Sequence, residues 1–158
     1  MELQVNGRAV DVGAAGDSAL IFVLRNQLGL MSPKLGCGLE QCGSCKVLVD
    51  DTAVCSCATP ASAFVGRTIE TLESLGSADQ LTPVQQALLG HNAAQCGYCL
   101  SGIVIAAEAL FRRNPTPSDA EIREALDDHL CRCGAQPRML RALNSLSAAN
   151  ARNDGGGQ

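Results

Sequence analysis

The sequence is poor in aromatic residues, with no Trp, one Tyr and three Phe among 158 residues. It also has little positive charge, since 12 Lys and Arg stand against 16 Asp and Glu and give a formal net charge of -4. Proteins that bind single-stranded nucleic acid stack bases on aromatic side chains, and phosphate backbones attract clustered cations. The composition therefore argues against nucleic acid as a partner.

Long apolar runs and a targeting segment are also missing. No run approaches the roughly 18 apolar residues that indicate a membrane-spanning helix, so we expect no membrane span. The start of the chain, Met1-Glu2-Leu3-Gln4, has neither a basic region nor twin arginines. We therefore expect a cytoplasmic protein.

Cysteine, by contrast, is abundant, with nine residues. In a reducing compartment these are expected to bind metal rather than to form disulfides, because thiols there stay reduced. Eight cysteines fit two four-ligand sites, and one is left over.

The first set of cysteines follows the spacing C-x4-C-x2-C in Cys37, Cys42 and Cys45, with Cys57 completing the set. This is the ligand pattern of a plant-type 2Fe-2S cluster. Zinc also accepts four sulfurs, but structural zinc sites usually pair two short hooks of two ligands each. Three ligands crowd one loop here, so the spacing indicates an iron–sulfur cluster.

The fourth ligand of this set could be either cysteine of Val54-Cys55-Ser56-Cys57. We expect only one of the two thiols to complete the site, with the other on the opposite face of the strand. We choose Cys57 as the ligand. Cys55 is then the spare cysteine, and we expect it to act as a small buried hydrophobic residue.

The second set consists of a C-x2-C pair, Cys96 and Cys99, and a C-x-C pair, Cys131 and Cys133. Alone, two such hooks are ambiguous between zinc and iron–sulfur. Iron is the more economical interpretation beside a plant-type loop, because one assembly pathway then fills both sites.

The first half of the chain alternates apolar and polar residues around two turn signals, Asn6-Gly7 and Asp50-Asp51. These patterns predict two hairpins, and Thr68-Ile69-Glu70 predicts a further strand. A helix through Leu20 and Leu28, with Asp17 or Ser18 as its N-cap, is expected to cover the sheet. We assign residues 1–75 to this mixed domain.

Beyond a linker at residues 76–82 the apolar period changes to about 3.6, which predicts helices. Thr82-Pro83-Val84-Gln85 and Ser118-Asp119-Ala120-Glu121 are capping boxes that open two of them. Two more are expected at 100–113 and from Pro137 onward. Residues 83–147 form a helical domain with its cysteines at helix ends, where helix dipoles favour thiolates. The polar tail, 148–158, is expected to be disordered, and the fold class is α+β.

The chain resembles the small iron–sulfur subunit of the molybdenum hydroxylases, the family of xanthine dehydrogenase, aldehyde oxidoreductase and carbon monoxide dehydrogenase. The resemblance covers residues 2 to 147 and is closest to the isoquinoline and nicotinate type of N-heteroaromatic dehydrogenase. It rests on these motifs: Gly36-Cys37-Gly38, Gln41-Cys42-Gly43-Ser44-Cys45, Gln95-Cys96-Gly97-Tyr98-Cys99, Pro117-Ser118-Asp119-Ala120-Glu121-Ile122 and Leu130-Cys131-Arg132-Cys133-Gly134.

The resemblance implies a β-grasp ferredoxin-like domain followed by a four-helix bundle, each holding one 2Fe-2S cluster. It also implies a large partner subunit with a molybdopterin-type molybdenum cofactor, which Gln95 and Cys133 approach. Electrons then pass the helical-domain cluster and the ferredoxin-like cluster, and reach an FAD subunit or a haem-containing cytochrome. On this resemblance the whole complex is expected to hydroxylate an N-heteroaromatic compound such as a nicotinate-like substrate, and this chain is expected to supply no catalytic residue.

Three alternatives remain open from the residues alone. The chain could serve an aldehyde or purine dehydrogenase, it could be a freestanding ferredoxin, or it could be a zinc-stapled interaction module. Metal content separates the last alternative from the others, and copurification with a molybdenum subunit separates the second.

Some positions depart from the family pattern: Lys46 stands where Thr is common, Asp51 replaces a turn Gly, and Asp128-His129 replaces Gly-Asn. Lys46 is either a solvated lysine or a cation that raises the potential of the first cluster. A Rieske-type role for His129 is disfavoured because all four cysteines are present. His91 is expected to face solvent.

Overall fold

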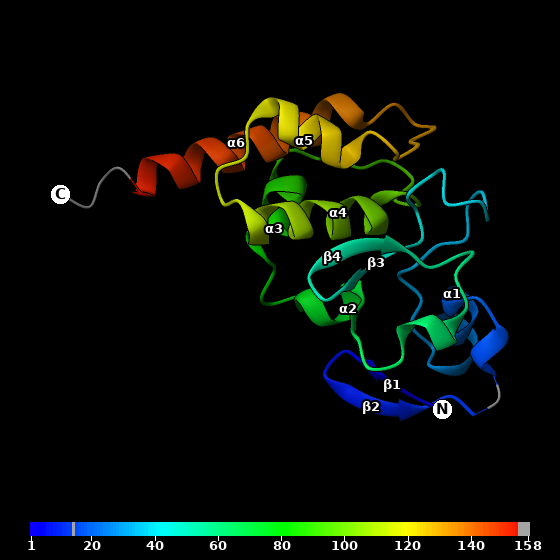
Figure 1. Cartoon of the computed structure of the whole chain (residues 1–158). Helices are drawn as coiled ribbons and strands as arrows, with labels where there is room; N and C mark the ends of the chain where they lie inside the picture. The colour runs from blue at the N-terminus through cyan, green and yellow to red at the C-terminus, as the bar shows by residue number, and fades with distance from the viewer. Residues whose placement is uncertain (14, 155–158) are drawn as a thin grey trace.

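The first half of the chain forms a five-stranded mixed sheet in the order β2-β1-β5-β3-β4. A computed structural model describes residues 1–13 and 15–154 (Figure 1). Strands β1 and β5 run parallel, and all other neighbouring strands are antiparallel. The strands are β1 (Glu2–Val5), β2 (Arg8–Asp11), β3 (Lys46–Val49), β4 (Thr52–Cys55) and β5 (Thr68–Glu70).

Both predicted hairpins are present, and their turns explain why. Asn6 and Gly7 have φ angles of 51° and 73°, and Asp50 and Asp51 have φ angles of 47° and 63°. Two successive positive φ angles match the right-handed twist of paired strands, and Asn, Asp and Gly tolerate them best. The register follows, with Val5 opposite Arg8 and Val49 opposite Thr52.

The sheet buries side chains on both faces near its centre. Leu3, Val47 and Ile69 pack with Leu20 and other residues of the following helical segment in one core. Leu48 is also fully buried, on the alternate side of β3, where the long helix α4 (Leu100–Arg113) contacts the strand. Strand β3 is therefore sandwiched between the two halves of the molecule.

The helical segment after β2 differs from the prediction. Helix α1 spans only Leu20–Phe22 and continues as a π-helical turn at Val23–Gln27. Neither Asp17 nor Ser18 caps it, because backbone carbonyls of the chain after β4 take that role: Leu20 N donates to Thr59 O at 3.0 Å, and Ile21 N donates to Ser56 O at 2.9 Å. The predicted N-cap is therefore wrong.

The second half is helical, with a short α2 (Leu72–Leu75) followed by α3 (Pro83–Gly90), α4, α5 (Asp119–Leu126) and α6 (Gln136–Asp154). Both predicted capping boxes are formed in full, by Thr82 with Gln85 and by Ser118 with Glu121. The α+β class is confirmed. The buried residues shared by these helices include Leu88, Ile103, Val104, Leu110, Ile122, Met139 and Leu143.

Helix α6 runs further than expected. It is helical through Asp154, so the predicted disorder of residues 148–154 is wrong, whereas 155–158 lie outside the described residues. The polar side chains that suggested a tail hold the helix in place: Ser147 Oγ donates to Pro117 O and Asn150 Nδ2 donates to Pro115 O, both at 2.7 Å. Alanines at 148, 149 and 151 favour the helix further.

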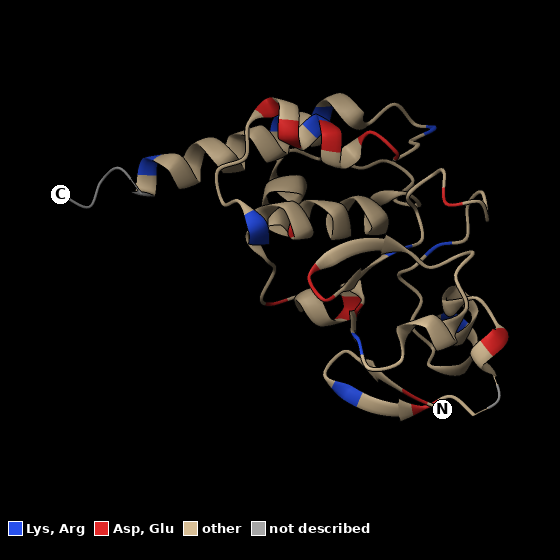
Figure 2. Cartoon of the chain, in the orientation of Figure 1, with Lys and Arg blue, Asp and Glu red and all other residues tan. Residues whose placement is uncertain are grey.

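The two halves meet along α4, which contacts both β3 and β4. Figure 2 shows acidic residues at the turn of the β3–β4 hairpin and basic residues at the end of α4. Arg112 joins them, because its guanidinium binds Glu70 at 2.8 Å and 3.0 Å and also pairs with Asp51. Over the described part of the chain, no helix has both the length and the apolar character to cross a membrane.

Candidate metal centres

The first cysteine loop joins the π-helical turn to β3, and its backbone amides point at sulfur. Leu39 N and Gln41 N donate to Cys37 Sγ at 3.3 Å and 3.2 Å, and Cys37 N donates to Cys42 Sγ at 3.3 Å. Because these amides stabilise negative charge, they lower the pKa of the exposed Cys37 thiol. The loop is therefore built to hold thiolates.

Glycine makes this wrapping possible. A Cβ at Gly36 would lie 2.6 Å from Cys42 Sγ, so a side chain there would displace the sulfur. Gly38 has a φ of 69°, which a residue with a Cβ rarely adopts. The space beside Cys42 is thus kept open by the sequence itself.

The structure brings Cys57 to the same loop. Cys45 and Cys57 are buried together beside Ile21, and Cys57 receives a hydrogen bond from the Glu40 amide. Burial raises the pKa of the Cys57 thiol to about 11, whereas that of Cys45 is lowered to about 5, chiefly by a hydrogen bond from Cys55. Cys57 therefore meets the first three cysteines where a fourth ligand is needed.

Cys55 is half-buried rather than buried, and it lies on β4 beside Cys45. The expectation that it faces away from the site is wrong, because side chains two residues apart share a face of a strand. Its hydrogen bond to Cys45 and its burial raise its own pKa, so it stays a neutral thiol that donates a proton towards a neighbouring sulfur. The expectation of a purely apolar role is therefore too simple.

The second set of cysteines gathers at the ends of helices, as predicted. Cys99 is the N-cap of α4 with Cys96 in the preceding turn, and Cys131 and Cys133 lie in the turn between α5 and α6. A small cavity is lined by all four together with Gln95. Gly97 and Gly134, with φ angles of 78° and 68°, form the tight turns that let the two hooks face each other.

The thiols of the second set also differ in pKa, because they differ in burial and in hydrogen bonding. The pKa of the buried Cys99 is raised to about 12, mainly because burial disfavours the thiolate. The Tyr98 amide lowers the pKa of Cys96, and the Ala135 amide, which donates to Cys131 Sγ at 3.5 Å, helps to lower that of Cys131 despite its partial burial. Backbone amides thus serve both sets.

The sulfurs of each set lie within hydrogen-bonding reach of one another in pairs. The pairs are Cys37 with Cys42, Cys45 with Cys57, Cys96 with Cys133, and Cys99 with Cys131. Each iron of a 2Fe-2S cluster takes two protein ligands, so paired thiols fit this group. In the described ranges, no group of three or more His, Cys, Asp or Glu side chains is arranged so that it could hold a single metal ion.

The two loops touch each other at the end of the molecule that lies opposite the C-terminus (Figure 1). Leu130 N, next to Cys131, donates to Cys42 O at 3.2 Å. Tyr98, between Cys96 and Cys99, donates its hydroxyl to Leu35 O at 2.8 Å. The backbones of the two cysteine loops are therefore in direct hydrogen-bond contact.

Three of the residues that depart from the family pattern, Lys46, Asp128 and His129, lie at this contact between the loops. Lys46 is not solvated, because only 10% of its side chain is exposed and Nζ binds Asp128 Oδ1 at 2.8 Å. Burial opposes ionisation of Asp128, but Lys46 outweighs it and the pKa of Asp128 lies below its usual value. His91 is exposed, as predicted.

His129 is buried, and both ring nitrogens are directed away from sulfur. Nε2 lies 3.2 Å from Gly102 O, and Nδ1 lies 3.2 Å from Asp128 Oδ1. Burial, with help from Lys46, lowers the pKa of His129, so the ring is neutral, Nε2 donates to Gly102, and Nδ1 has no hydrogen-bond partner in the described chain. A metal-ligand role for His129 is not supported.

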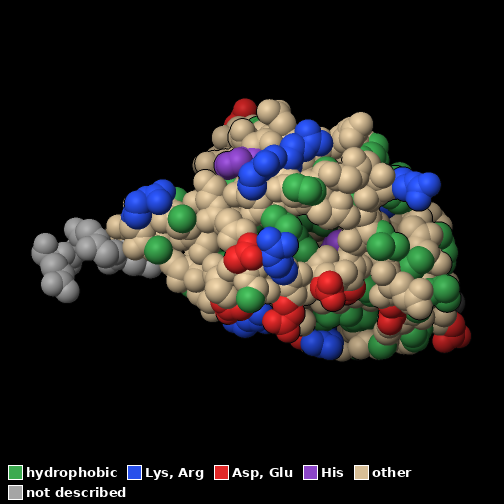
Figure 3. Space-filling view, turned by 90° about the horizontal axis from the view of Figure 1, so that it is seen from above, with side chains coloured by type: hydrophobic (Ala, Val, Ile, Leu, Met, Phe, Trp, Pro, Cys, Tyr) green, Lys and Arg blue, Asp and Glu red, His purple; other side chains and the backbone are tan. Residues whose placement is uncertain are grey.

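Exposed apolar side chains flank the cysteines: Leu39 is 68% exposed, Leu130 65% and Tyr98 49%. In the view from above, hydrophobic side chains gather towards the end of the molecule that lies opposite the C-terminus (Figure 3). Large contiguous apolar patches are typical of protein interaction sites, and these three side chains lie beside the cysteines of both sets.

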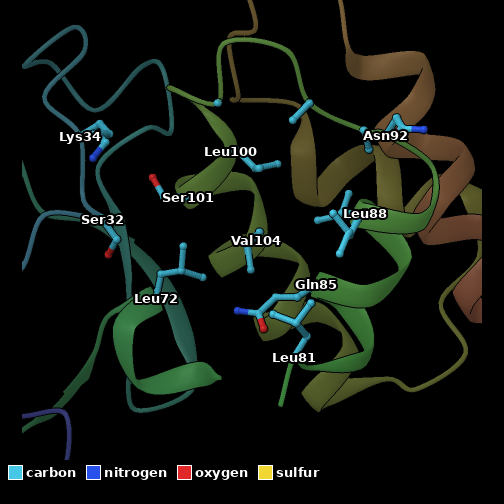
Figure 4. A pocket seen from close by; sticks show the side chains of 14 residues that line it. Ser32, Lys34, Leu72, Leu81, Gln85, Leu88, Asn92, Leu100, Ser101 and Val104 are labelled. Carbon is cyan, nitrogen blue, oxygen red and sulfur yellow. The ribbon is translucent and has the colours of Figure 1, made fainter. Parts of the chain in front are cut away.

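A separate apolar cavity of about 610 Å³ lies between α3, α4 and the first half of the chain. Leu72, Leu88, Leu100 and Val104 point into it, and Ser32 and Lys34 lie at its other side (Figure 4). No cysteine lines it, so this cavity is not one of the candidate centres.

Comparisons with known proteins agree with two iron–sulfur domains. Residues 3–71 match the family described as 2Fe-2S iron-sulfur cluster binding domain, and residues 68–144 match the family described as [2Fe-2S] binding domain.

Similar proteins span nearly the whole chain. The chain is 50% identical to a nicotinate dehydrogenase subunit of Pseudomonas putida KT2440, over 90% of this chain and 91% of that protein. It is 40% identical to the alpha subunit of isoquinoline 1-oxidoreductase from Brevundimonas diminuta, over 91% and 95%. A chain of quinoline 2-oxidoreductase from Pseudomonas putida 86 has the same fold, with a TM-score of 0.84, 33% identity and coverage of 96% and 95%.

Proposed function

Because the chain belongs to the iron–sulfur subunits of the molybdenum hydroxylases, we propose that it carries electrons from a molybdenum site on a large subunit to an acceptor. A 2Fe-2S cluster exchanges one electron at a time when it is bound. The observation that carries the proposal is the gathering of eight cysteines into two sets whose loops meet at the Leu130–Cys42 hydrogen bond.

The eight ligands are assigned to two domains. Cys37, Cys42, Cys45 and Cys57 hold the first cluster in the ferredoxin-like domain, residues 1–75. Cys96, Cys99, Cys131 and Cys133 hold the second in a four-helix bundle of α3 to α6 that follows the linker at 76–82; its predicted bounds, 83–147, are exceeded by α6. The sulfur pairs and the amides directed at Cys37 and Cys131 support this assignment.

Exposure and contact support an order of transfer that begins at the second site. Gln95 and Cys96 are exposed there and Gln95 lines the site with Cys133, which supports the proposal that Gln95 and Cys133 meet the pterin of the molybdenum cofactor. Electrons then cross to the first site through the loops joined at Leu130 and Cys42. They leave at the exposed Cys37 for an FAD subunit or a cytochrome.

The substrate of the whole complex is an N-heteroaromatic compound such as a nicotinate-like acid. The names of the similar subunits, which belong to a nicotinate dehydrogenase and an isoquinoline oxidoreductase, support this class. A small subunit of an aldehyde or purine dehydrogenase is the second candidate, since the aldehyde oxidoreductase iron-sulfur-binding subunit PaoA of Escherichia coli is 35% identical. We place the protein in the cytoplasm, because cysteines that serve as iron ligands have to stay reduced.

Copurification and spectroscopy test the proposal together. The chain, coexpressed with its large subunit under oxygen-free isolation, should contain four irons and show two distinct 2Fe-2S signals in electron paramagnetic resonance after dithionite reduction. Nicotinate should reduce both clusters only when the large subunit is present. Cys37→Ser and Cys96→Ser, both at exposed cysteines, should each remove a different signal. A colourless chain with stoichiometric zinc would overturn the proposal.

A further inference from the structure

The junction between the two cysteine loops contains an ion pair in which the lysine is buried and the aspartate is half exposed. Lys46 directly follows Cys45 at the start of β3, and Asp128 precedes Cys131 by three residues after α5. Their side chains meet at 2.8 Å, and the lysine is nine-tenths buried. The pair therefore joins the segment that carries Cys45 to the segment that carries Cys131.

His129 fills the space behind this pair. A Cβ at Gly43 would lie only 2.4 Å from His129 Cδ2, so the ring packs directly on the backbone between Cys42 and Cys45. The same ring is fixed from the other side by the Gly102 carbonyl of α4 at 3.2 Å. The turn before Cys131 is thus held on both sides.

An ion pair in this position favours a single arrangement. A lysine held out of water is costly unless it is paired, so the closed arrangement of the loops is favoured as long as Asp128 pairs with Lys46. The Leu130 N to Cys42 O hydrogen bond at 3.2 Å lies in the same junction and depends on that arrangement.

We propose that Lys46 and Asp128 are positioning residues that clamp the two cysteine loops together and so fix the separation of the two redox centres. The clamp itself is a feature of the polypeptide, and its effect on electron transfer rests on the proposed function. The contact that carries the clamp joins Lys46 Nζ to Asp128 Oδ1, and both residues act through the backbone of the loops.

Hydrogen exchange measures the clamp directly. In the purified complex, Asp128→Asn should speed exchange of the Leu130 amide at least tenfold, because the Cys42 contact opens more often. Lys46→Met removes the other partner of the same ion pair and should speed exchange of the Leu130 amide by a similar factor. This variant replaces Asp128→Asn in the experiment if Asp128→Asn folds poorly. The double variant should exchange no faster than the faster single variant, because both remove one interaction.

Arg67→Ala is the matched control. Arg67 pairs with Asp50 at 2.7 Å, but both side chains are 47% exposed and both belong to the first half of the chain. This variant should leave the Leu130 amide as protected as in the unchanged protein. Equal protection in all variants, or equal loss in the control, would overturn the clamp.

Magnetic resonance adds the redox readout. In Asp128→Asn and Lys46→Met, the spin coupling between the two reduced clusters should become weaker or take a broader range of values, because their separation is no longer fixed. Both variants should retain four irons per chain. Retained iron with unchanged coupling and unchanged exchange rejects the clamp alone. Absence of iron in the unchanged protein rejects the proposed function, and the exchange experiment still decides whether the loops are clamped.

Discussion

Cys55 and Cys57, near the end of β4, are the two candidates for the fourth ligand of the first set, and their positions differ by only two residues. Cys57 lies past the strand end, where the Glu40 amide and Cys45 meet it, whereas Cys55 is still held by β4. Both thiols approach Cys45, so proximity alone does not separate them. Burial does, because Cys57 is buried with Ile21 and Cys45 whereas Cys55 is only partly buried against them.

We expect Cys57→Ser to lose the first cluster signal and about half of the iron, because a hydroxyl is a poor replacement for a thiolate ligand. Cys55→Ala should keep four irons and both signals. It should also lower the reduction potential of the first cluster, because a hydrogen bond to a ligand sulfur is lost. Iron analysis and a redox titration measure both effects, and loss of iron in Cys55→Ala with retention in Cys57→Ser would reverse the assignment.

Glycine at position 102 permits the closest backbone approach in the interface. A Cβ there would lie 2.0 Å from Gly43 O. Gly102→Ala should therefore destabilise the protein by about 2–3 kcal/mol, as overpacking does. Gly90→Ala, at the last residue of α3 with open space around it, should be neutral or stabilising by up to about 1 kcal/mol. Denaturant unfolding of both variants checks the contrast; equal effects would show that the approach is not tight.

At the scale of helices and strands, local chemistry was the part that the sequence could predict. The Asn6-Gly7 turn and the Thr82 and Ser118 caps depend only on residues within a few positions, and all three are present. The bounds of α4 were predicted to the residue, because Asn114-Pro115 stops the helix.

Features that depend on distant parts of the chain could not be predicted. The start of α1 is satisfied by carbonyls of Ser56 and Thr59, about 35 residues further on, so no local cap was needed. Lys46 could be recognised as unusual for its position, but only the fold reveals Asp128 as its partner. The assignment of cysteines to sets came from spacing, whereas the contact between the sets through Leu130 carried no signal in the sequence.

The contact of Glu108 in α4 with the N-cap of α3 makes a contribution to stability that depends on pH. Glu108 of α4 is 8% exposed and accepts a hydrogen bond from the Thr82 hydroxyl, the N-cap of α3. Burial raises its pKa above the ordinary 4.5, although Thr82 and Arg112 act in the opposite direction. The folded state therefore binds this proton more tightly than the unfolded state, and the contribution of Glu108 to stability falls as the pH rises from about 4.5 through the raised value.

Glu108→Gln removes this titration. Relative to the unchanged protein, the variant should gain stability between pH 5.0 and pH 7.5, because only the carboxyl becomes charged in the interior over that range. Urea unfolding at the two pH values measures the change. Glu124→Gln on the exposed part of α5 is the control; a stability difference that does not vary with pH in Glu108→Gln would contradict the expectation.

Across the whole molecule, we expect the local stability of the two cysteine loops to depend on bound iron more than the stability of the sheet does. Metal binding stabilises only the folded ligands, so its removal lowers stability by the free energy of binding. After anaerobic chelation, residues 36–45 and 94–99 should exchange amide hydrogens much faster, whereas β1 and β2 should change little. Mass spectrometry with hydrogen exchange tests this, and uniform loosening of the whole chain would contradict it.

The parallel pairing of β1 with β5 ties Gln4 to Thr68 and Val5 to Ile69. During synthesis the first strand must wait for residues near 70 to leave the ribosome before the sheet can close, because this pairing is non-local. All four cysteines of the first set emerge before that moment, whereas Cys96 and its partners are still to be made. The ligands of the first set are therefore synthesised before the sheet that positions them can close.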